Sequence, residues 1–222
     1  MPLATQRRTH IEDPGAAFID RLSSYWERNG RLTLGALGVL AAAGIIAFFT
    51  LKARAAAENE ASAQLTEASF FFWQGDYVRS LQVAKQLSEQ FPSTWSGVDA
   101  LRIAGDDCYW NGDWKTAVDY YRRYLEKNRS GVVSDAARRS YAYALESDRQ
   151  YKAAAGEFET LVGKFDRESS AEFLSAAARC YRALGQPDEA AKRLRRVLDE
   201  YGETTQAMSA RVRLGELGQS AL

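Results

Sequence analysis

The hydrophobic and polar pattern of the chain is dominated by an uninterrupted apolar segment near its N-terminus. Residues Leu32 to Leu51 contain no charged residue, and their only polar residues are two threonines. Arg31 and Lys52 bound the segment closely. A helix of about 20 residues, rising ~1.5 Å per residue, spans the ~30 Å hydrocarbon core of a bilayer. Because buried helices of soluble proteins are usually shorter or polar on one face, the pattern predicts a transmembrane helix over residues 32–51.

A cleaved signal peptide is the alternative interpretation of this segment. The apolar run is longer than the ~7–15 residues of a usual signal-peptide core, and about thirty residues come before it. The sequence Ala53-Arg54-Ala55 resembles a cleavage site, but Lys52 and Arg54 crowd it. No cysteine follows directly, which excludes lipoprotein processing. We therefore expect an uncleaved anchor.

The distribution of basic residues around the segment predicts its orientation. Lys and Arg concentrate on the cytoplasmic side of membrane helices. The C-terminal flank carries only Lys52 and Arg54 before a gap that lasts to Arg79. We expect a cytoplasmic N-terminus and a C-terminal domain on the other side, because the N-terminal flank is richer in basic residues: Arg7, Arg8, Arg21, Arg28 and Arg31.

The stretch just before the span has helical periodicity. Pro14 suits a helix start, and Asn29-Gly30 suits a turn before the membrane helix. A short amphipathic helix at the membrane interface is one interpretation, and a partly ordered tail is the other. The apolar residues that recur at helical spacing are Phe18, Ile19, Leu22, Tyr25 and Trp26.

The remainder of the chain repeats itself with a period of about 37 residues. The segments WQGDYVRSLQVA (73–84), WNGDWKTAVDYY (110–121), SDRQYKAAAGEF (147–158) and ALGQPDEAAKRL (183–194) align with one another. Their matching turn positions are Gly75, Gly112, Arg149 and Gly185, spaced 37, 37 and 36 residues apart. A recurring turn between two helical stretches indicates stacked helix pairs.

This pattern resembles the tetratricopeptide repeat (TPR), whose unit is a pair of antiparallel helices. The resemblance covers most of residues 61–202, and it departs from the family pattern at two turns, where Arg149 replaces glycine and Pro187 replaces the aromatic residue. The closing proline occurs once, at Pro92, and Arg129, Asp166 and Gly202 stand at the equivalent positions. The resemblance implies small first-helix residues at Ala68, Gly105, Ala142 and Ala178, larger residues before the turn at Phe71, Cys108, Leu145 and Tyr181, and second-helix residues at Ala84, Tyr121, Phe158 and Leu194.

We therefore predict an all-α protein: one transmembrane helix followed by an α-solenoid of about four TPR-like helix pairs over residues 52–202. Because residues 52–73 contain neither proline nor glycine, the membrane helix is expected to continue into the first repeat helix. A capping helix is expected over residues 203–222, with its apolar residues covering the last repeat: Ala207, Met208, Val212, Leu214 and Leu217.

Composition argues against an enzyme and against a cofactor. Lys plus Arg equals Asp plus Glu, at 29 each, so the chain lacks the basic excess of nucleic-acid-binding proteins. His10 is the only histidine, which argues against histidine-based catalysis. Cys108 and Cys180 fall in separate repeats and are expected to be buried thiols rather than a disulfide. The cluster Asp106, Asp107 and Asp113 lacks the oxygen count and spacing of a calcium site and is expected to be surface charge.

Partner binding is the better hypothesis. In stacked helix pairs of this family the first helices line a concave groove, and aromatic residues and arginine supply much of the energy of protein interfaces. The alternative is that Trp73, Tyr109 and Trp110 pack against neighbouring repeats. The residues projected into this groove, aromatic at one end and basic at the other, are Phe72, Trp73, Arg102, Asp106, Tyr109, Trp110, Arg139, Tyr143, Arg179 and Arg182.

The whole arrangement resembles bacterial inner-membrane proteins that carry periplasmic TPR domains. It is most similar to the family of ancillary subunits of the Sec translocon, on the basis of this architecture and of the pattern FIDRLSSYWERNGR before the span. That resemblance implies an interaction role, in which the protein holds envelope chaperones or emerging clients near a membrane complex. A permanent structural subunit of a large membrane assembly is the alternative.

Overall fold

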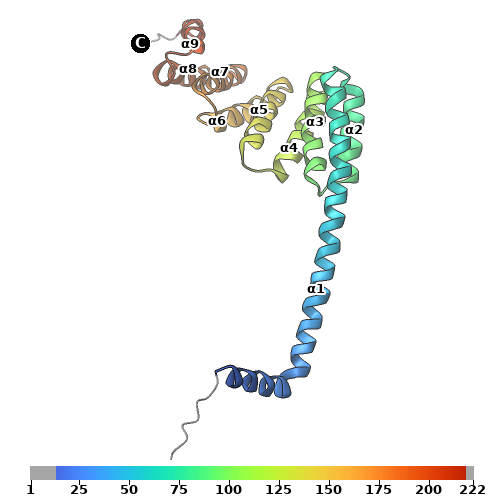
Figure 1. The fold of residues 1–222 in the computed structure, drawn as a ribbon. Helices are drawn as coiled ribbons and strands as arrows, with labels where there is room; N and C mark the ends of the chain where they lie inside the picture. Colours follow the sequence, from blue (N-terminus) through green and yellow to red (C-terminus); the bar gives the residue numbers. More distant parts are fainter. Residues whose placement is uncertain (1–13, 219–222) are drawn as a thin grey trace, which may run out of the picture. The chain divides into compact units, whose positions relative to one another are not determined.

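The computed structural model describes residues 14–218, and all the elements in this range are α-helices (Figure 1). Residues 1–13 and 219–222, including His10, Arg7 and Arg8, lie outside the described range. The chain divides into two compact units, residues 1–55 and 56–222, which are described in turn. The helices are α1 (Pro14–Trp73), α2 (Tyr77–Gln90), α3 (Trp95–Trp110), α4 (Trp114–Lys127), α5 (Val132–Ser147), α6 (Tyr151–Leu161), α7 (Arg167–Ala183), α8 (Pro187–Glu200) and α9 (Thr205–Glu216).

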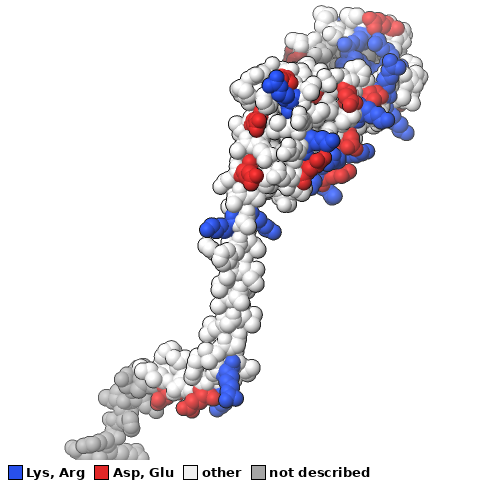
Figure 2. Space-filling model, turned by 90° about the vertical axis from the view of Figure 1, so that its right-hand side faces the viewer, with Lys and Arg blue, Asp and Glu red and all other residues white. Residues whose placement is uncertain are grey.

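The N-terminal unit is the first part of α1, which begins at Pro14 as the sequence predicts. By length and composition alone, α1 contains one stretch apolar enough to cross a membrane, and none of that stretch is buried inside the protein. Its side chains form a surface without charge between two groups of basic side chains (Figure 2). Such a helix has no apolar partner among the described residues that would make it a core helix.

The predicted turn at Asn29-Gly30 is wrong, because both residues remain helical. The hydroxyl of Thr33 donates to the carbonyl of Asn29 at 2.7 Å, a local bond that often accompanies helix bending. Figure 1 shows that α1 changes direction sharply in its N-terminal quarter without leaving the helical conformation. This part of α1 therefore bends without a turn that would divide the helix.

The second unit contains four antiparallel helix pairs followed by a single helix. From Ala56 onward α1 pairs with α2, whose Ser80 hydroxyl donates to the carbonyl of Ala68 in α1. The next pairs are α3 with α4, α5 with α6 and α7 with α8 (Figure 1). α9 packs on α8 and α7 at the end of the stack. The expected continuation of the apolar helix into the first repeat helix is confirmed, since α1 is unbroken to Trp73.

The turns inside the four pairs have the same geometry. In the first turn, Gly75 has φ +79° and its N–H donates to the carbonyl of Phe72, while the N–H of Asp76 donates to the carbonyl of Phe71 at 3.0 Å. The same two bonds recur at the other three turns. This is a Schellman-type helix end, which requires a left-handed residue. The left-handed residues of the later turns are Gly112, Arg149 and Gly185, with φ of +82°, +61° and +70°.

The core of the stack lies where the aligned small and large residues meet. The small first-helix positions Ala68, Gly105, Ala142 and Ala178 are all buried, and so are the second-helix positions Ala84, Tyr121, Phe158 and Leu194. Phe158 also stacks on Phe173, from the next pair, with ring centroids 6.4 Å apart. Small residues let the helices approach closely, and the large ones fill the space between successive pairs.

Two glutamates occupy the same position in their repeats, and each connects its helix pair to the next helix of the stack. Glu58 in α1 accepts hydrogen bonds from the backbone N–H groups of Trp95 and Ser96 and from the Ser96 hydroxyl, at 2.6 to 3.0 Å. Glu168 in α7 makes the equivalent contacts with the N–H and hydroxyl of Thr205. Each carboxylate thus caps the N-terminus of the helix that follows its own helix pair, where unpaired N–H groups favour negative charge.

α9 covers the last pair with a narrower apolar face than the sequence predicts. Ala207, Ala210 and Leu214 are buried. Met208 is 68% exposed and Val212 is 57% exposed, so these two residues do not contribute to the cap as expected. Met208 and Val212 are four residues apart and therefore lie on one face of α9, which is exposed to solvent.

Candidate functional site

Two rows of side chains run along the first helices of the pairs. The residues three positions before each turn are Phe72, Tyr109, Glu146 and Arg182. The residues six positions before each turn are Ser69, Asp106, Tyr143 and Arg179. Positions three apart lie on one face of a helix. Since the helix pairs stack in register, the two rows form a continuous strip that changes from aromatic to charged along the stack.

A hollow of about 310 Å³ lies on this strip between α3, α4 and α5. Four of its lining residues were expected in the groove: Asp106, Tyr109, Trp110 and Tyr143. The other two, Tyr121 and Ser140, were not. Tyr121 was expected at a second-helix position of its repeat; it is buried there and also lines the hollow. Sequence periodicity places a Cα on a face and does not report how far a long side chain reaches.

A partly buried carboxylate, that of Asp106, lines the hollow. Asp106 accepts a hydrogen bond from the Tyr121 hydroxyl at 2.6 Å and another from Arg102 at 3.0 Å. Burial raises the pKa of Asp106, while the bonds from Tyr121 and Arg102 oppose that rise. The Tyr143 hydroxyl donates to Glu172. The hollow therefore combines aromatic walls with polar groups that are already fixed in place, a composition typical of preformed recognition sites.

Aromatic side chains extend from the hollow toward the first repeat. Tyr77 stacks on Trp110 with ring centroids 6.5 Å apart and also contacts Phe72 at 5.6 Å. Phe72 in turn meets Trp73 edge to face at 5.5 Å. Trp73 is 83% exposed and Trp110 is 63% exposed. These two tryptophans are thus supported by neighbouring rings and still leave most of their surface open, whereas Tyr109 is half-buried.

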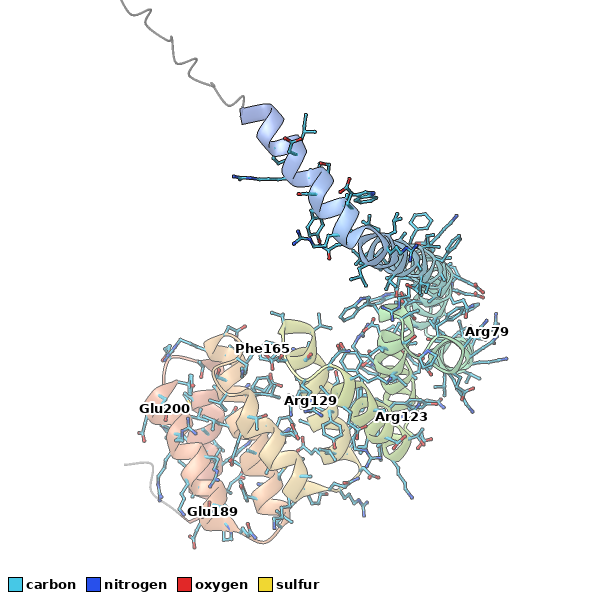
Figure 3. The ribbon with its side chains drawn as sticks, turned by 90° about the horizontal axis from the view of Figure 1, so that it is seen from below. Arg79, Arg123, Arg129, Phe165, Glu189 and Glu200 are labelled. Atoms are coloured by element: carbon cyan, nitrogen blue, oxygen red, sulfur yellow. The ribbon has the colours of Figure 1, made fainter. Side chains whose placement is uncertain are left out.

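The four arginines expected in the groove each contact a neighbouring side chain. Arg102 is bonded to Asp99 and Asp106, and Arg179 binds Glu146 through two bonds of 2.9 and 3.0 Å. Arg182 lies 3.4 Å from Glu216. The guanidinium of Arg139 lies over the ring of Phe165, and Phe165 is labelled in Figure 3. Arg102 and Arg179 are therefore held by carboxylates, of which Asp106 was itself expected in the groove and Asp99 and Glu146 were not.

The three aspartates of the acidic cluster and the two cysteines lie in different surroundings. Asp106 belongs to the hollow, Asp107 is buried, and Asp113 caps α4 by accepting from the N–H of Thr116. Within residues 14–218, no three or more His, Cys, Asp or Glu side chains are grouped to hold a metal ion. Cys108 and Cys180 are buried free thiols, and burial raises the pKa of each to about 12, which disfavours the reactive thiolate.

Comparison with known proteins identifies the repeat and the fold. The family described as tetratricopeptide repeat matches residues 174–204, which comprise the end of α7, the whole of α8 and the turn after it. None of the curated protein sequences matches the chain. The family match thus falls on the fourth helix pair of the stack, where the sequence pattern also predicts a repeat.

Several solved structures have the same fold. A protein described as a kinesin light chain from Podosopora anserina, with nearly identical TPR-like repeats, has a TM-score of 0.58 at 17% identity and covers 72% of this chain and 85% of its own. MamA from Desulfovibrio magneticus RS-1 has a TM-score of 0.58 at 16% identity, covering 71% and 82%. A tetratricopeptide repeat protein from Parabacteroides merdae has 0.60 at 16%, covering 72% and 60%. The predicted all-α, TPR-like solenoid is confirmed.

Proposed function

Starting from a TPR-like helical-repeat protein with one long apolar N-terminal helix, we propose that the chain is a membrane-anchored scaffold that binds a segment of another protein in its groove. TPR domains bind other proteins, and folds of this kind are typically interaction modules rather than catalysts. The proposed location is the extracytoplasmic face of a bacterial inner membrane, with the N-terminus in the cytoplasm. The partners are envelope chaperones, client peptides or subunits of a membrane complex.

The hollow beside Trp110 is the observation that carries this proposal. Its volume of about 310 Å³ is at the lower end of the ~300–1,000 Å³ of small-molecule pockets, so it suits one large side chain of a partner. An exposed tryptophan at its rim, held by Tyr77 and Tyr109, costs little conformational entropy on binding. Tryptophan and tyrosine are the residues most enriched among interface hot spots.

The apolar part of α1 supports the membrane anchor. Residues 32–51 are long enough to span a bilayer, and their large apolar side chains are exposed. Exposed leucine, isoleucine and phenylalanine over that length are costly in water and favourable in lipid. The greater number of arginines before the span supports the proposed orientation, which protease access to a C-terminal tag in cells with a permeabilised outer membrane would test.

Two matched tryptophan variants test the groove. Trp95 is 79% exposed at the opposite end of α3, about 22 Å from Trp110 at ~1.5 Å per residue, and it does not line the hollow. We expect Trp110→Ala to reduce partner recovery from mild-detergent extracts at least about tenfold, the loss of one hot spot. Trp95→Ala should leave recovery unchanged. Equal recovery of the same partner by both variants would remove the groove from the proposal.

A permanent structural subunit remains the second candidate function, and one observation favours it. Gly35, Gly38 and Gly44 leave open space on the apolar helix, where another membrane helix could approach closely. Exchange of the bound partner distinguishes the scaffold from the permanent structural subunit. A labelled partner that is displaced by excess unlabelled partner on the purified complex supports the scaffold, whereas a partner that never exchanges supports the fixed subunit.

A further inference from the structure

The hollow between α3, α4 and α5 combines aromatic rings with one carboxylate. Asp106 is the charged residue among the six that line it, and Ser140 is the neutral polar one. The other four lining residues are aromatic: Tyr109, Trp110, Tyr121 and Tyr143. The faces of aromatic rings carry partial negative charge and attract cations that lie over them. The rings and the carboxylate therefore favour the same sign of ligand charge.

Asp106 keeps the capacity to accept further hydrogen bonds. Its Oδ1 atom accepts from the hydroxyl of Tyr121 at 2.6 Å, and its Oδ2 atom accepts from Nη1 of Arg102 at 3.0 Å. A carboxylate has about four acceptor positions, two on each oxygen. Both oxygens thus have room for a donor from a ligand, while the two existing bonds hold the carboxylate in a fixed orientation.

The carboxylates beside the hollow outnumber the guanidinium group that pairs with them. Arg102 binds Asp99 through Nε and Nη2, at 2.9 and 2.8 Å, and reaches Asp106 through Nη1 alone. One positive charge is shared by two carboxylates, which leaves one negative charge in excess. Burial raises the pKa of Asp106, and the neighbouring charge of Asp99 adds to that rise. A ligand cation beside Asp106 would relieve this repulsion.

The charged groups on the α5 and α7 side of the hollow do not cancel this excess. The hydroxyl of Tyr143 donates to the carboxylate of Glu172. Arg179 is held by Glu146 through two hydrogen bonds, so this pair is neutral as a whole. Arg139 is exposed and does not line the hollow. The charges of Glu172 and Arg139 offset each other, so the excess negative charge beside Arg102 remains.

We infer that the hollow takes a cationic side chain, that of a lysine or an arginine, from the partner polypeptide. The apolar stem of that side chain lies along the aromatic walls, and its charged end donates to Asp106. Lysine and arginine bury their stems against apolar surface in this way, and charge-assisted bonds are about twice as strong as neutral ones. That the ligand belongs to a polypeptide rests on the proposed function, whereas the preference for positive charge rests on the hollow itself.

An apolar side chain is the alternative occupant of the hollow, and Asp106 disfavours it. Such a side chain would remove water from the carboxylate without supplying a donor in its place, and the burial of an unpaired charge is costly. An acidic side chain would add a third carboxylate to Asp99 and Asp106. A cationic side chain alone satisfies both the rings and the charge.

A pair of small amides tests the charge preference without any partner. Full-length protein in a neutral detergent is titrated with N-acetyl-L-arginine amide or with N-acetyl-L-citrulline amide, which has nearly the same shape but no charge, at matched ionic strength. Saturation transfer from the protein to the side-chain protons of the ligand, measured by NMR, gives an apparent Kd. We expect the arginine amide to bind at least about tenfold more tightly than the citrulline amide.

Two aspartate variants assign this preference to Asp106. Asp106→Asn removes the charge and keeps an oxygen that accepts from the Tyr121 hydroxyl. Asp119→Asn is the matched control, because Asp119 is likewise bonded to an arginine, Arg122, but does not line the hollow. We expect Asp106→Asn to weaken binding of the arginine amide at least about tenfold and Asp119→Asn to leave it unchanged. If Asp106→Asn fails to fold, Trp110→Leu at the exposed rim removes a ring and should weaken the same binding about threefold.

The outcomes separate the cation site from the proposed function. Equal binding of the two amides by the wild type, or an affinity for the arginine amide that Asp106→Asn does not change, would overturn the inference. Partner recovery that depends on Trp110, without a preference for the arginine amide, keeps the groove and removes the cation site. A preference for the arginine amide in a protein that recovers no partner keeps the cation site and removes the proposed function.

Discussion

The ring of Tyr121 lies directly against the backbone of Gly105. A Cβ atom added to Gly105 would stand 2.8 Å from both Cδ1 and Cε1 of the Tyr121 ring, closer than real Cβ contacts. The same ring position allows the Tyr121 hydroxyl to reach Asp106, the neighbour of Gly105, at 2.6 Å. Close packing of the second helix pair and the polar floor of the hollow therefore depend on one glycine.

Gly105→Ala tests this dependence. Although alanine favours a helix over glycine, the ring of Tyr121 would have to move, and overpacking of this kind usually costs about 1–3 kcal/mol of unfolding free energy. Gly156→Ala in α6 is the matched control, because nothing lies within 4 Å of that position and the exchange should stabilise by about 0.5–1 kcal/mol. Chemical denaturation measures both. A stabilised Gly105→Ala would show that the ring position is not constrained.

At the turn residue Arg149 we predict that a substitution to glycine stabilises the protein. It adopts φ +61° in the turn where the other three pairs have glycine. A left-handed conformation costs an L-residue roughly 1–2 kcal/mol, partly offset in a glycine variant by the greater freedom of the unfolded chain. We expect Arg149→Gly to raise the unfolding free energy by about 0.5–1 kcal/mol.

Gly112→Ala is the reciprocal variant for the same measurement. Gly112 has φ +82° and open space around it, so the loss of about 1 kcal/mol expected there reports the backbone conformation alone. If both variants changed stability in the same direction, the left-handed conformation would not be the cause.

Buried Asp107 predicts a pH dependence of stability. Neither of its carboxylate oxygens accepts a hydrogen bond from the described residues, and the Ser80 hydroxyl, which only in part opposes the rise in the pKa of Asp107, donates to the carbonyl of Ala68. Burial raises the pKa of Asp107 from 3.8 to about 7. The folded state then holds a proton that the unfolded state has released, so the contribution of Asp107 is fully present below pH ~4 and is lost as the pH rises to ~7.

Asp107→Asn removes this titration and keeps the shape of the side chain. Between pH ~4 and ~7 the unfolding free energy of the wild type should fall relative to the variant, with a slope approaching about 1.4 kcal/mol per pH unit. Denaturant unfolding at several pH values measures the difference. Parallel profiles for the two proteins would mean that Asp107 is charged in the folded state at pH 5 to 6.

Much of the repeat domain follows from local sequence rules. The turn glycines, the small residues at Ala142 and Ala178 and the large residues at Tyr121 and Phe158 fixed the register of the helix pairs, because each position has one steric requirement. The register was also correct at Arg149, where the residue type was wrong for the turn, since three neighbouring turns and the period determined the position. The expected turn at Asn29-Gly30 failed because glycine and asparagine favour a turn without enforcing one.

The site could be predicted only in part. Periodicity placed Asp106, Tyr109, Trp110 and Tyr143 on one face, and these four residues meet at the hollow. It did not show that Glu146 would neutralise Arg179, because their pairing joins first helices 33 residues apart in the sequence.

The central claim is that the groove of this protein holds a segment of another polypeptide, and site-specific photocrosslinking in intact cells tests it most directly. Trp110→p-benzoylphenylalanine places the probe at the rim of the hollow, and Trp95→p-benzoylphenylalanine places the same probe at the exposed far end of α3. The proposed function predicts a discrete crosslinked polypeptide from position 110, in the membrane fraction, and none from position 95. The same products from both positions, or none from position 110 while the protein is folded and membrane-bound, would contradict it.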